Sequence, residues 1–465
     1  MLKISRLLLA VIPLSLVTFC QSASTTQEQT APAAAPREIQ IPSVPMTPDT
    51  ITIRGKFADD CPVKGNLKIA LHNVDNTWWK DLPVTNGEFV FTHYLTEPRR
   101  AAIRTIYGVK FDFFVTTKEK VYEIEISCPE KTEQFSVKGS EENAAYLVYS
   151  NANKDLQTVL DSFAKQDITK EEVFNLVKKT IEDYQKTLAD VAAAHPNTFT
   201  AQVFCEAEKL PEGSLNSLES LQKNFLNRPA YANPQIYNDF LPQRILLNYL
   251  ALRTKNSDPN QPIETLMSIG LKNKKAAMNL QENMSNIFYR MHEEDLVKAF
   301  INWADRNPDK MYEQSVKARL QNLKKVVAGS PMIDFELKDP SGKLRKFSET
   351  VKSGKLTALI FYSPTCGHCK EKVPLFKPVW DEYNAKGLKI FAVGSSAKDE
   401  EWKSFIKTHA KAEWIHVFQY EEGSQPSDLY YASNPTFILI DSGGTIISRI
   451  GDEEDVIEMI HEKLK

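Results

Sequence analysis

The sequence predicts a multidomain chain with a small antiparallel β-sandwich, an all-α middle domain and a C-terminal α/β domain. Its 465 residues leave room for about three domains. Along the chain, short alternating apolar segments give way to segments with a helical apolar period, and these give way to buried strands that alternate with helices. The composition, 42% hydrophobic and 25% charged, excludes a largely disordered or multi-span membrane chain.

Charge and cysteine content narrow the function classes. The 57 basic and 60 acidic side chains give a net charge of −3, so no global basic field attracts nucleic acid. We therefore expect no nucleic-acid partner. Six cysteines are too few for a scaffold built from disulfides, so apolar packing must form the core.

Residues 1–20 are predicted to be a signal peptide of the lipoprotein type. The basic residues Lys3 and Arg6 precede an apolar run, 7–19, that is too short to span a bilayer. The run ends at Cys20 in a pattern that resembles a bacterial lipobox, in which the cysteine is lipidated. Ordinary cleavage a few residues later is the alternative, because Phe19 stands where a small residue is usual. Either route leads out of the cytoplasm, and we expect a periplasmic, membrane-anchored protein.

Residues 21–48 are rich in Ser, Thr, Gln, Ala and Pro, which predicts a flexible linker. Short alternating segments then fill residues 49–139 and predict the β-sandwich-like domain, with a hairpin signal at Asn86-Gly87. Cys61 and Cys128 both stand in loop-like settings of this domain. They are candidates for a structural disulfide.

Residues 140–328 are predicted to form a helical domain of seven or eight helices. Apolar residues recur there at helical spacing, and prolines separate the segments. The sequence from His292 to Asp295 resembles a metal cluster only superficially, because it lacks a pair of histidines at ligand spacing. A solvated helix face explains it better, and we expect no metal.

The C-terminal domain is predicted at residues 329–465. The fully apolar segment Leu356–Tyr362 is typical of a central strand that is buried on both faces. Further strands are predicted at 332–337, 344–347, 388–393, 414–418, 435–440 and 445–450, with helices after 366 and at 400–410 and 452–465.

Three features of this domain resemble the thioredoxin fold. The pair Cys366-Gly-His-Cys369 stands at a strand-to-helix junction, Pro374 follows within the helix, and Asn434-Pro435-Thr436 precedes a strand. The extra helix and strand at about 395–418 resemble the insertion of the TlpA/ResA branch of periplasmic thioredoxins. The whole chain resembles envelope lipoproteins that carry a β domain, a helical domain and a TlpA-like module.

The two cysteines also predict the chemistry directly. Thiol–disulfide exchange needs a thiolate nucleophile and a nearby second thiol that resolves the mixed disulfide. Cys366 would stand at a helix N-terminus, where unsatisfied N–H groups favour thiolate. His368 can add a donor or a charge. Cys369 lies one turn further in and would attack second, so the redox-active Cys366–Cys369 pair needs no cofactor.

The resemblance implies a cis peptide bond before Pro435, which would expose the backbone of Asn434 for pairing with substrate. We place Gly367, Asn434 and Thr436 in the substrate-binding surface.

Two positions depart from the family. Ile360 replaces the buried carboxylate of thioredoxins, and Lys372 stands where the ResA branch often has Glu. The proton acceptor for Cys369 is therefore open between Glu371 and water.

The predicted function is a thiol–disulfide oxidoreductase that reduces envelope protein disulfides and is fed by a membrane electron donor. A disulfide oxidase or isomerase on the same fold is one alternative. A non-enzymatic envelope binding module with a vestigial redox pair is another. Half a zinc site would also use a Cys-x-x-Cys pair, but no second pair accompanies this one. A structural disulfide is a further alternative, and the position at a strand-to-helix junction, with Pro374 and Pro435 in register, favours a redox pair over it.

Overall fold

The computed structural model describes residues 47–61, 65–71, 79–105, 108–128, 134–163, 166–238, 241–254, 257–291, 293–420, 425–449 and 453–465. The predicted signal peptide, Cys20, nearly all of the predicted linker and His292 lie outside these ranges. Within them, no helix is both long enough and apolar enough to cross a membrane.

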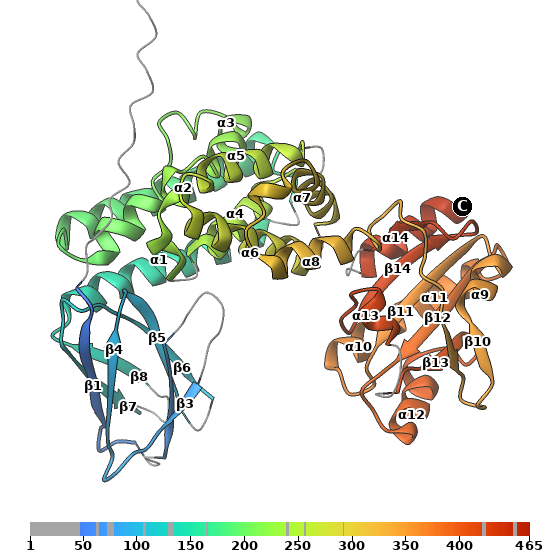
Figure 1. Ribbon diagram of the computed structural model, residues 1–465, viewed down its shortest axis with the longest axis horizontal. Helices are drawn as coiled ribbons and strands as arrows, with labels where there is room; N and C mark the ends of the chain where they lie inside the picture. The colour runs from blue at the N-terminus through green and yellow to red at the C-terminus, as the bar shows by residue number, and fades with distance from the viewer. Residues whose placement is uncertain are drawn as a thin grey trace, which may run out of the picture. The chain divides into compact units, whose positions relative to one another are not determined.

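The N-terminal region is a β-sandwich of two four-stranded sheets (Figure 1), which confirms the predicted fold class. Inward-facing residues of both sheets, such as Ile53 and Phe113, share one core. In sheet order, the first sheet is β4 (Glu88–Leu95), β1 (Asp49–Phe57), β7 (Val121–Ser127) and β8 (Gln134–Lys138). The second is β3 (Trp79–Leu82), β2 (Leu67–Leu71), β5 (Arg99–Arg104) and β6 (Lys110–Val115).

One strand pair differs from the antiparallel expectation: β1 and β7 run parallel. A short hairpin forces antiparallel pairing, whereas strands far apart in the chain can meet in either direction. Five strands separate β1 from β7, so local sequence could not specify their relative direction.

A disulfide joins Cys61, just after β1, to Cys128, at the end of β7, as expected from their loop-like settings. Both residues are buried in the sandwich core. The bond therefore links the ends of two neighbouring strands across 67 residues of chain.

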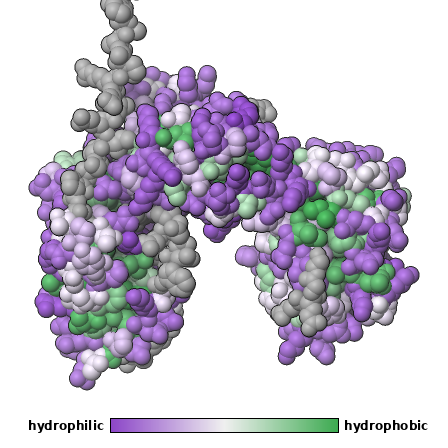
Figure 2. Space-filling model, viewed as in Figure 1, coloured by the Kyte–Doolittle hydropathy of each residue, from purple (hydrophilic) through white to green (hydrophobic). Residues whose placement is uncertain are grey.

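The middle region is all-helical, as predicted. Apolar stripes such as Val173, Val177 and Ile181 of α2 face one shared core. Hydrophilic side chains cover most of the visible surface of this region (Figure 2). The α-helices of the described residues are α1 (Glu141–Phe163), α2 (Glu171–Ala194), α3 (Leu218–Phe225), α4 (Leu241–Leu252), α5 (Asn260–Gly270), α6 (Lys274–Arg290), α7 (Glu294–Arg306) and α8 (Gln314–Leu323).

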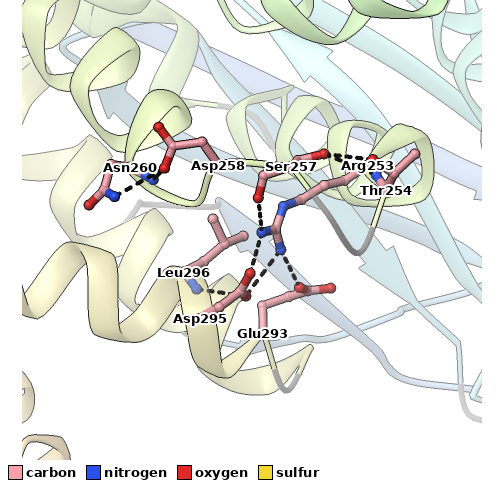
Figure 3. A network of polar contacts seen from close by, with 8 residues as sticks. All are labelled: Arg253, Thr254, Ser257, Asp258, Asn260, Glu293, Asp295 and Leu296. Carbon is pink, nitrogen blue, oxygen red and sulfur yellow. Dashed lines mark hydrogen bonds and ion pairs between the residues drawn. The ribbon is translucent and has the colours of Figure 1, made fainter. Parts of the chain in front are cut away.

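Two polar features of this region serve its structure. Arg253, almost fully buried, forms ion pairs with Glu293 and Asp295 at the start of α7 (Figure 3). These acidic side chains belong to the segment that superficially resembled a metal cluster. Cys205 is a buried free thiol, and burial raises its pKa to about 12.

The C-terminal region has a seven-stranded sheet in the order β10-β9-β13-β12-β11-β14-β15. Successive residues of β11 face two separate cores, Ile360 one and Phe361 the other, which explains its unbroken apolar sequence. The strands are β9 (Glu336–Lys338), β10 (Leu344–Lys346), β11 (Leu356–Tyr362), β12 (Leu388–Gly394), β13 (Ile415–Phe418), β14 (Thr436–Asp441) and β15 (Ile446–Ser448). The helices are α9 (Phe347–Ser353), α10 (Gly367–Lys372), α11 (Phe376–Tyr383), α12 (Asp399–His409), α13 (Pro426–Leu429) and α14 (Glu453–Leu464).

Candidate active site

The two cysteines of the motif lie where the central strand β11 passes into α10. Cys366 is the N-cap residue of α10, and its backbone N–H donates to Ser363 O at 3.1 Å. Cys369 lies one turn inside the helix and is fully buried, whereas Cys366 is half-buried. Both are free thiols. The first cysteine is therefore reachable from solvent, and the second is protected behind it.

Burial sets the chemistry of Cys369. It raises the pKa of the Cys369 thiol to about 12, although the backbone N–H of Ser363 donates to the sulfur at 3.4 Å and opposes this shift. A thiol in this environment holds its proton at neutral pH. Cys369 is thus suited to act after another thiol has reacted.

The predicted proline positions have the expected local structure. Pro374 lies in a 3₁₀ turn, Val373–Leu375, between α10 and α11. Proline has no backbone N–H, so it interrupts the helical hydrogen bonds at that turn. The peptide bond between Asn434 and Pro435 is cis, as the motif implied.

The loop that contains the cis bond lies against the first cysteine. The sulfur of Cys366 donates to Asn434 O at 3.7 Å. The Asn434 side chain donates to Ser395 Oγ at 3.0 Å, and the hydroxyl of Thr436 donates to Ser433 O at 2.7 Å. The fold therefore brings Cys366 to the loop that contains the predicted site residues Asn434, Pro435 and Thr436, although Cys366 and Asn434 are 68 positions apart in the chain.

The surroundings of Cys366 differ in one respect from the sequence-based expectation. Its side chain makes no capping hydrogen bond with the N–H groups of α10, and its sulfur is directed to the Asn434 carbonyl instead. The carbonyl oxygen accepts a hydrogen bond from the S–H group. The helix terminus is thus not the only backbone group that acts on this sulfur.

The other motif residues lie on the surface of α10. The His368 side chain is 78% exposed, and its Nδ1 is 3.9 Å from Glu371 Oε2. Gly367 is exposed, and a Cβ atom built on it would meet nothing within 4 Å. The space beside Gly367, next to Cys366 in the chain, is therefore open.

A buried carboxylate that the sequence did not reveal lies beside this helix. Lys372, at the position where the ResA branch often has Glu, forms an ion pair with Glu453 at the start of α14. The Glu453 side chain is only 8% exposed. The two residues are 81 positions apart in the chain, so spacing alone could not have indicated the pair.

Ser395 is the second residue that sequence reasoning missed. It directly follows β12, the parallel neighbour of β11. Its backbone N–H donates to Tyr362 O at 3.0 Å, and its hydroxyl lies 3.5 Å from the same oxygen. Its place at the carboxyl end of a central strand is the one signal that could have identified it, because sites of α/β proteins gather there.

Comparison with known proteins agrees with this geometry. Residues 354–446 match a family model described as thioredoxin-like. The chain is 26% identical over 141 residues to the thiol-disulfide oxidoreductase ResA of Halalkalibacterium halodurans, a match that covers 30% of this chain and 77% of ResA. It is also 26% identical over 118 residues to the methylamine utilization protein MauD of Paracoccus denitrificans, covering 25% of this chain and 56% of MauD.

Among solved structures, the thioredoxin domain of a thiol-disulfide oxidoreductase from Bacteroides vulgatus is similar, with 21% sequence identity and a TM-score of 0.28. The match covers 30% of this chain and 99% of that one. The residues that match the family model, 354–446, contain both the cysteine pair and the cis-proline loop. The C-terminal part of the chain is therefore thioredoxin-like and is similar in sequence to a thiol–disulfide oxidoreductase.

Proposed function

We propose that the protein reduces disulfides of envelope proteins through Cys366 and Cys369, on the periplasmic side of a membrane to which Cys20 anchors it. The observation that carries the proposal is the pairing of a half-buried thiol with a fully buried one, a helical turn apart. That arrangement suits an attacking thiol and a resolving thiol.

In the first step the Cys366 thiolate attacks one sulfur of a substrate disulfide. A bond forms between Cys366 and that sulfur, the substrate disulfide breaks, and the other substrate sulfur leaves as thiolate. The open space beside Gly367 admits the substrate. The backbone around Asn434 and Thr436 offers a short edge for pairing with substrate main chain.

In the second step Cys369 loses its proton and attacks Cys366. The Cys366–Cys369 disulfide forms, the mixed disulfide breaks, and the second substrate sulfur leaves. The two protons that the cysteines lose end on the two substrate thiols, and two electrons pass to the substrate. The pair is then reduced again by a membrane electron donor.

The direction of transfer depends on the reduction potential of the pair. We expect a value between about −270 and −180 mV, the range between thioredoxin and protein disulfide isomerase. In this range the partner that recharges the pair decides the direction. The resemblance of the C-terminal motifs to the TlpA/ResA branch favours reduction.

Three experiments test the proposal. Titration of the full-length protein against glutathione buffers measures the potential, and alkylation in growing cells measures the redox state of the pair. A potential near −120 mV, the DsbA value, or a mainly oxidised pair in cells would support an oxidase instead. Trapping mixed disulfides with Cys369→Ala identifies substrates, and capture of none would support a binding module with an unused pair.

The anchor is tested separately. Wild-type protein should incorporate a fatty-acid analogue and partition into detergent, whereas Cys20→Ala should do neither. If the wild type stays unlabelled, the signal peptide is cleaved in the ordinary way and the protein is unanchored.

A further inference from the structure

We propose that Ser395 is a positioning residue for disulfide exchange: its hydroxyl group holds the Asn434 side chain and thereby keeps the Asn434 carbonyl against the sulfur of Cys366. The inference deepens the proposed function and rests on Cys366 being the attacking thiol. It does not depend on the direction of electron transfer.

The contacts form a continuous path from one cysteine to the other. Cys366 Sγ is 3.7 Å from Asn434 O, and Asn434 Nδ2 is 3.0 Å from Ser395 Oγ. Ser395 is bound in turn to Tyr362 O. Ser363, which directly follows Tyr362 in the chain, donates its backbone N–H to Cys369 Sγ. Ser395 is thus the link between the cis-proline loop and the strand that leads into the cysteine motif.

The hydrogen-bonding roles at Ser395 are fixed by chemistry. The Asn434 amide nitrogen can only donate, so the Ser395 oxygen accepts from it. The hydroxyl proton of Ser395 is then directed to the Tyr362 carbonyl, 3.5 Å away. Ser395 is only 6% exposed, so water cannot readily replace these partners.

The consequence for Cys366 follows from the direction of its own hydrogen bond. A carbonyl oxygen that accepts the S–H proton stabilises the thiol, and its partial negative charge opposes the thiolate. When the Ser395 hydroxyl is removed, Asn434 loses its anchor and its carbonyl is free to move away. Cys366 should then form thiolate more easily.

Removal of the hydroxyl should spare the fold. The backbone N–H of Ser395 donates to Tyr362 O whatever the side chain, so the connection of β12 to β11 persists in Ser395→Ala. Asn434→Leu removes the same hydrogen bond from the other side. The pair of variants keeps the test decisive even if one of them fails to fold.

The experiment measures iodoacetamide alkylation of Cys366 against pH in full-length protein that carries Cys369→Ser. At about pH 6, Ser395→Ala should react about 1.5- to 3-fold faster. Loss of one hydrogen bond should increase the thiolate fraction of Cys366 about two- to tenfold. Because a less basic thiolate is also a weaker nucleophile, the logarithm of the rate should rise by only about half as much.

The pH profile separates positioning from simple exposure. At alkaline pH, where Cys366 is fully ionised in every variant, the gain should turn into a small loss because the less basic thiolate is the weaker nucleophile. Better access to the sulfur would instead speed the reaction at every pH. The titratable groups on the same helix, His368, Lys370, Glu371 and Lys372, are common to all variants. Ser395→Thr, which keeps the hydroxyl, should behave like the protein with Ser395 intact.

Two further variants complete the test. The double variant Asn434→Leu with Ser395→Ala should gain no more alkylation rate at about pH 6 than either single variant, because both changes remove the same hydrogen bond. Ser353→Ala is the matched control, because it removes a hydroxyl that is bound to Thr350 O in α9. It should leave the pH profile of Cys366 alkylation unchanged. An unchanged profile in folded Ser395→Ala, or fully additive effects in the double variant, would overturn the inference. A protein that proves to be an oxidase would refute only the proposed direction.

Discussion

At the scale of single residues, the two cysteines differ most in burial. Cys369 is fully buried with a pKa raised to about 12, and Cys366 is half-buried beside the Asn434 carbonyl. We predict that iodoacetamide at neutral pH labels Cys366 first. Cys366→Ser should abolish exchange with a disulfide substrate, and Cys369→Ser should accumulate mixed disulfides.

The matched control for this prediction is Cys205, a buried free thiol of the helical region. Cys205→Ser should leave the exchange rate unchanged. Mass spectrometry of the alkylated protein identifies the modified residue, and labelling of Cys369 before Cys366 would reverse the roles that we assign.

A second residue makes stability depend on pH. His416 is buried on β13, its Nε2 lies 2.8 Å from Lys411 O, and its ring stacks on Trp414. Burial lowers its pKa to about 4. Between about pH 6.5 and about pH 4 the unfolded chain binds a proton that the folded chain does not, so the free energy of unfolding falls as pH decreases through this range.

We expect His416 to account for a loss of about 2–3 kcal/mol between pH 7.5 and pH 4, measured by urea unfolding. His416→Gln does not titrate and keeps a donor for Lys411 O. The variant should therefore lose this part of the pH dependence. If the free energy of unfolding depends on pH equally in wild type and variant, groups other than His416 cause the dependence.

At the scale of elements, an ion pair fastens the short motif helix α10 to α14. Lys372 is about one-third exposed, whereas its partner Glu453 is almost fully buried. Removing one partner of such a pair leaves a charge without compensation in a poorly solvated place. Because Lys372 is partly solvated, we predict that Lys372→Met lowers the free energy of unfolding by about 1–2 kcal/mol, less than for a fully buried pair.

The double variant with Glu453→Gln should recover part of this loss, because no buried charge then remains unpaired. Lys370→Met, an exposed position on the same helix, is the control and should change stability by less than about 0.5 kcal/mol. Equal effects at the two lysines would show that the ion pair does not stabilise the attachment of α10.

At the scale of the whole molecule, the two cysteine pairs have separate tasks. The Cys61–Cys128 disulfide closes 67 residues of chain within the β-sandwich. In the chain-entropy description, a loop of this length stabilises the folded state by about 4 kcal/mol. We predict that replacing both residues with Ala lowers the stability of the β region by about 2–4 kcal/mol, seen as an earlier thermal transition.

Disulfide exchange at Cys366 should be unchanged in that variant below its unfolding temperature, because the redox site is built from the C-terminal sheet and its helices. Loss of exchange in a protein that is still folded would show that the β region contributes to the reaction.

The sequence by itself determined the features that depend on neighbours in the chain. The apolar run Leu356–Tyr362 identified the central strand, and the cysteine spacing identified the redox motif at its end. Pro374 interrupts the helical hydrogen bonds through its own ring, whereas the cis bond before Pro435 was implied by the resemblance of its motif to the thioredoxin fold. The sandwich and the helical region also followed from short-range apolar periods.

Only the tertiary structure decided which distant residues meet. The parallel pairing of β1 with β7, the approach of Glu453 to Lys372, and the link from Ser395 to Asn434 each join segments far apart in the chain. The orientation of the Cys366 sulfur toward Asn434 rather than the N–H groups of α10 is of the same kind. Such contacts arise from the packing of whole elements, and periodicity and spacing carry no record of them.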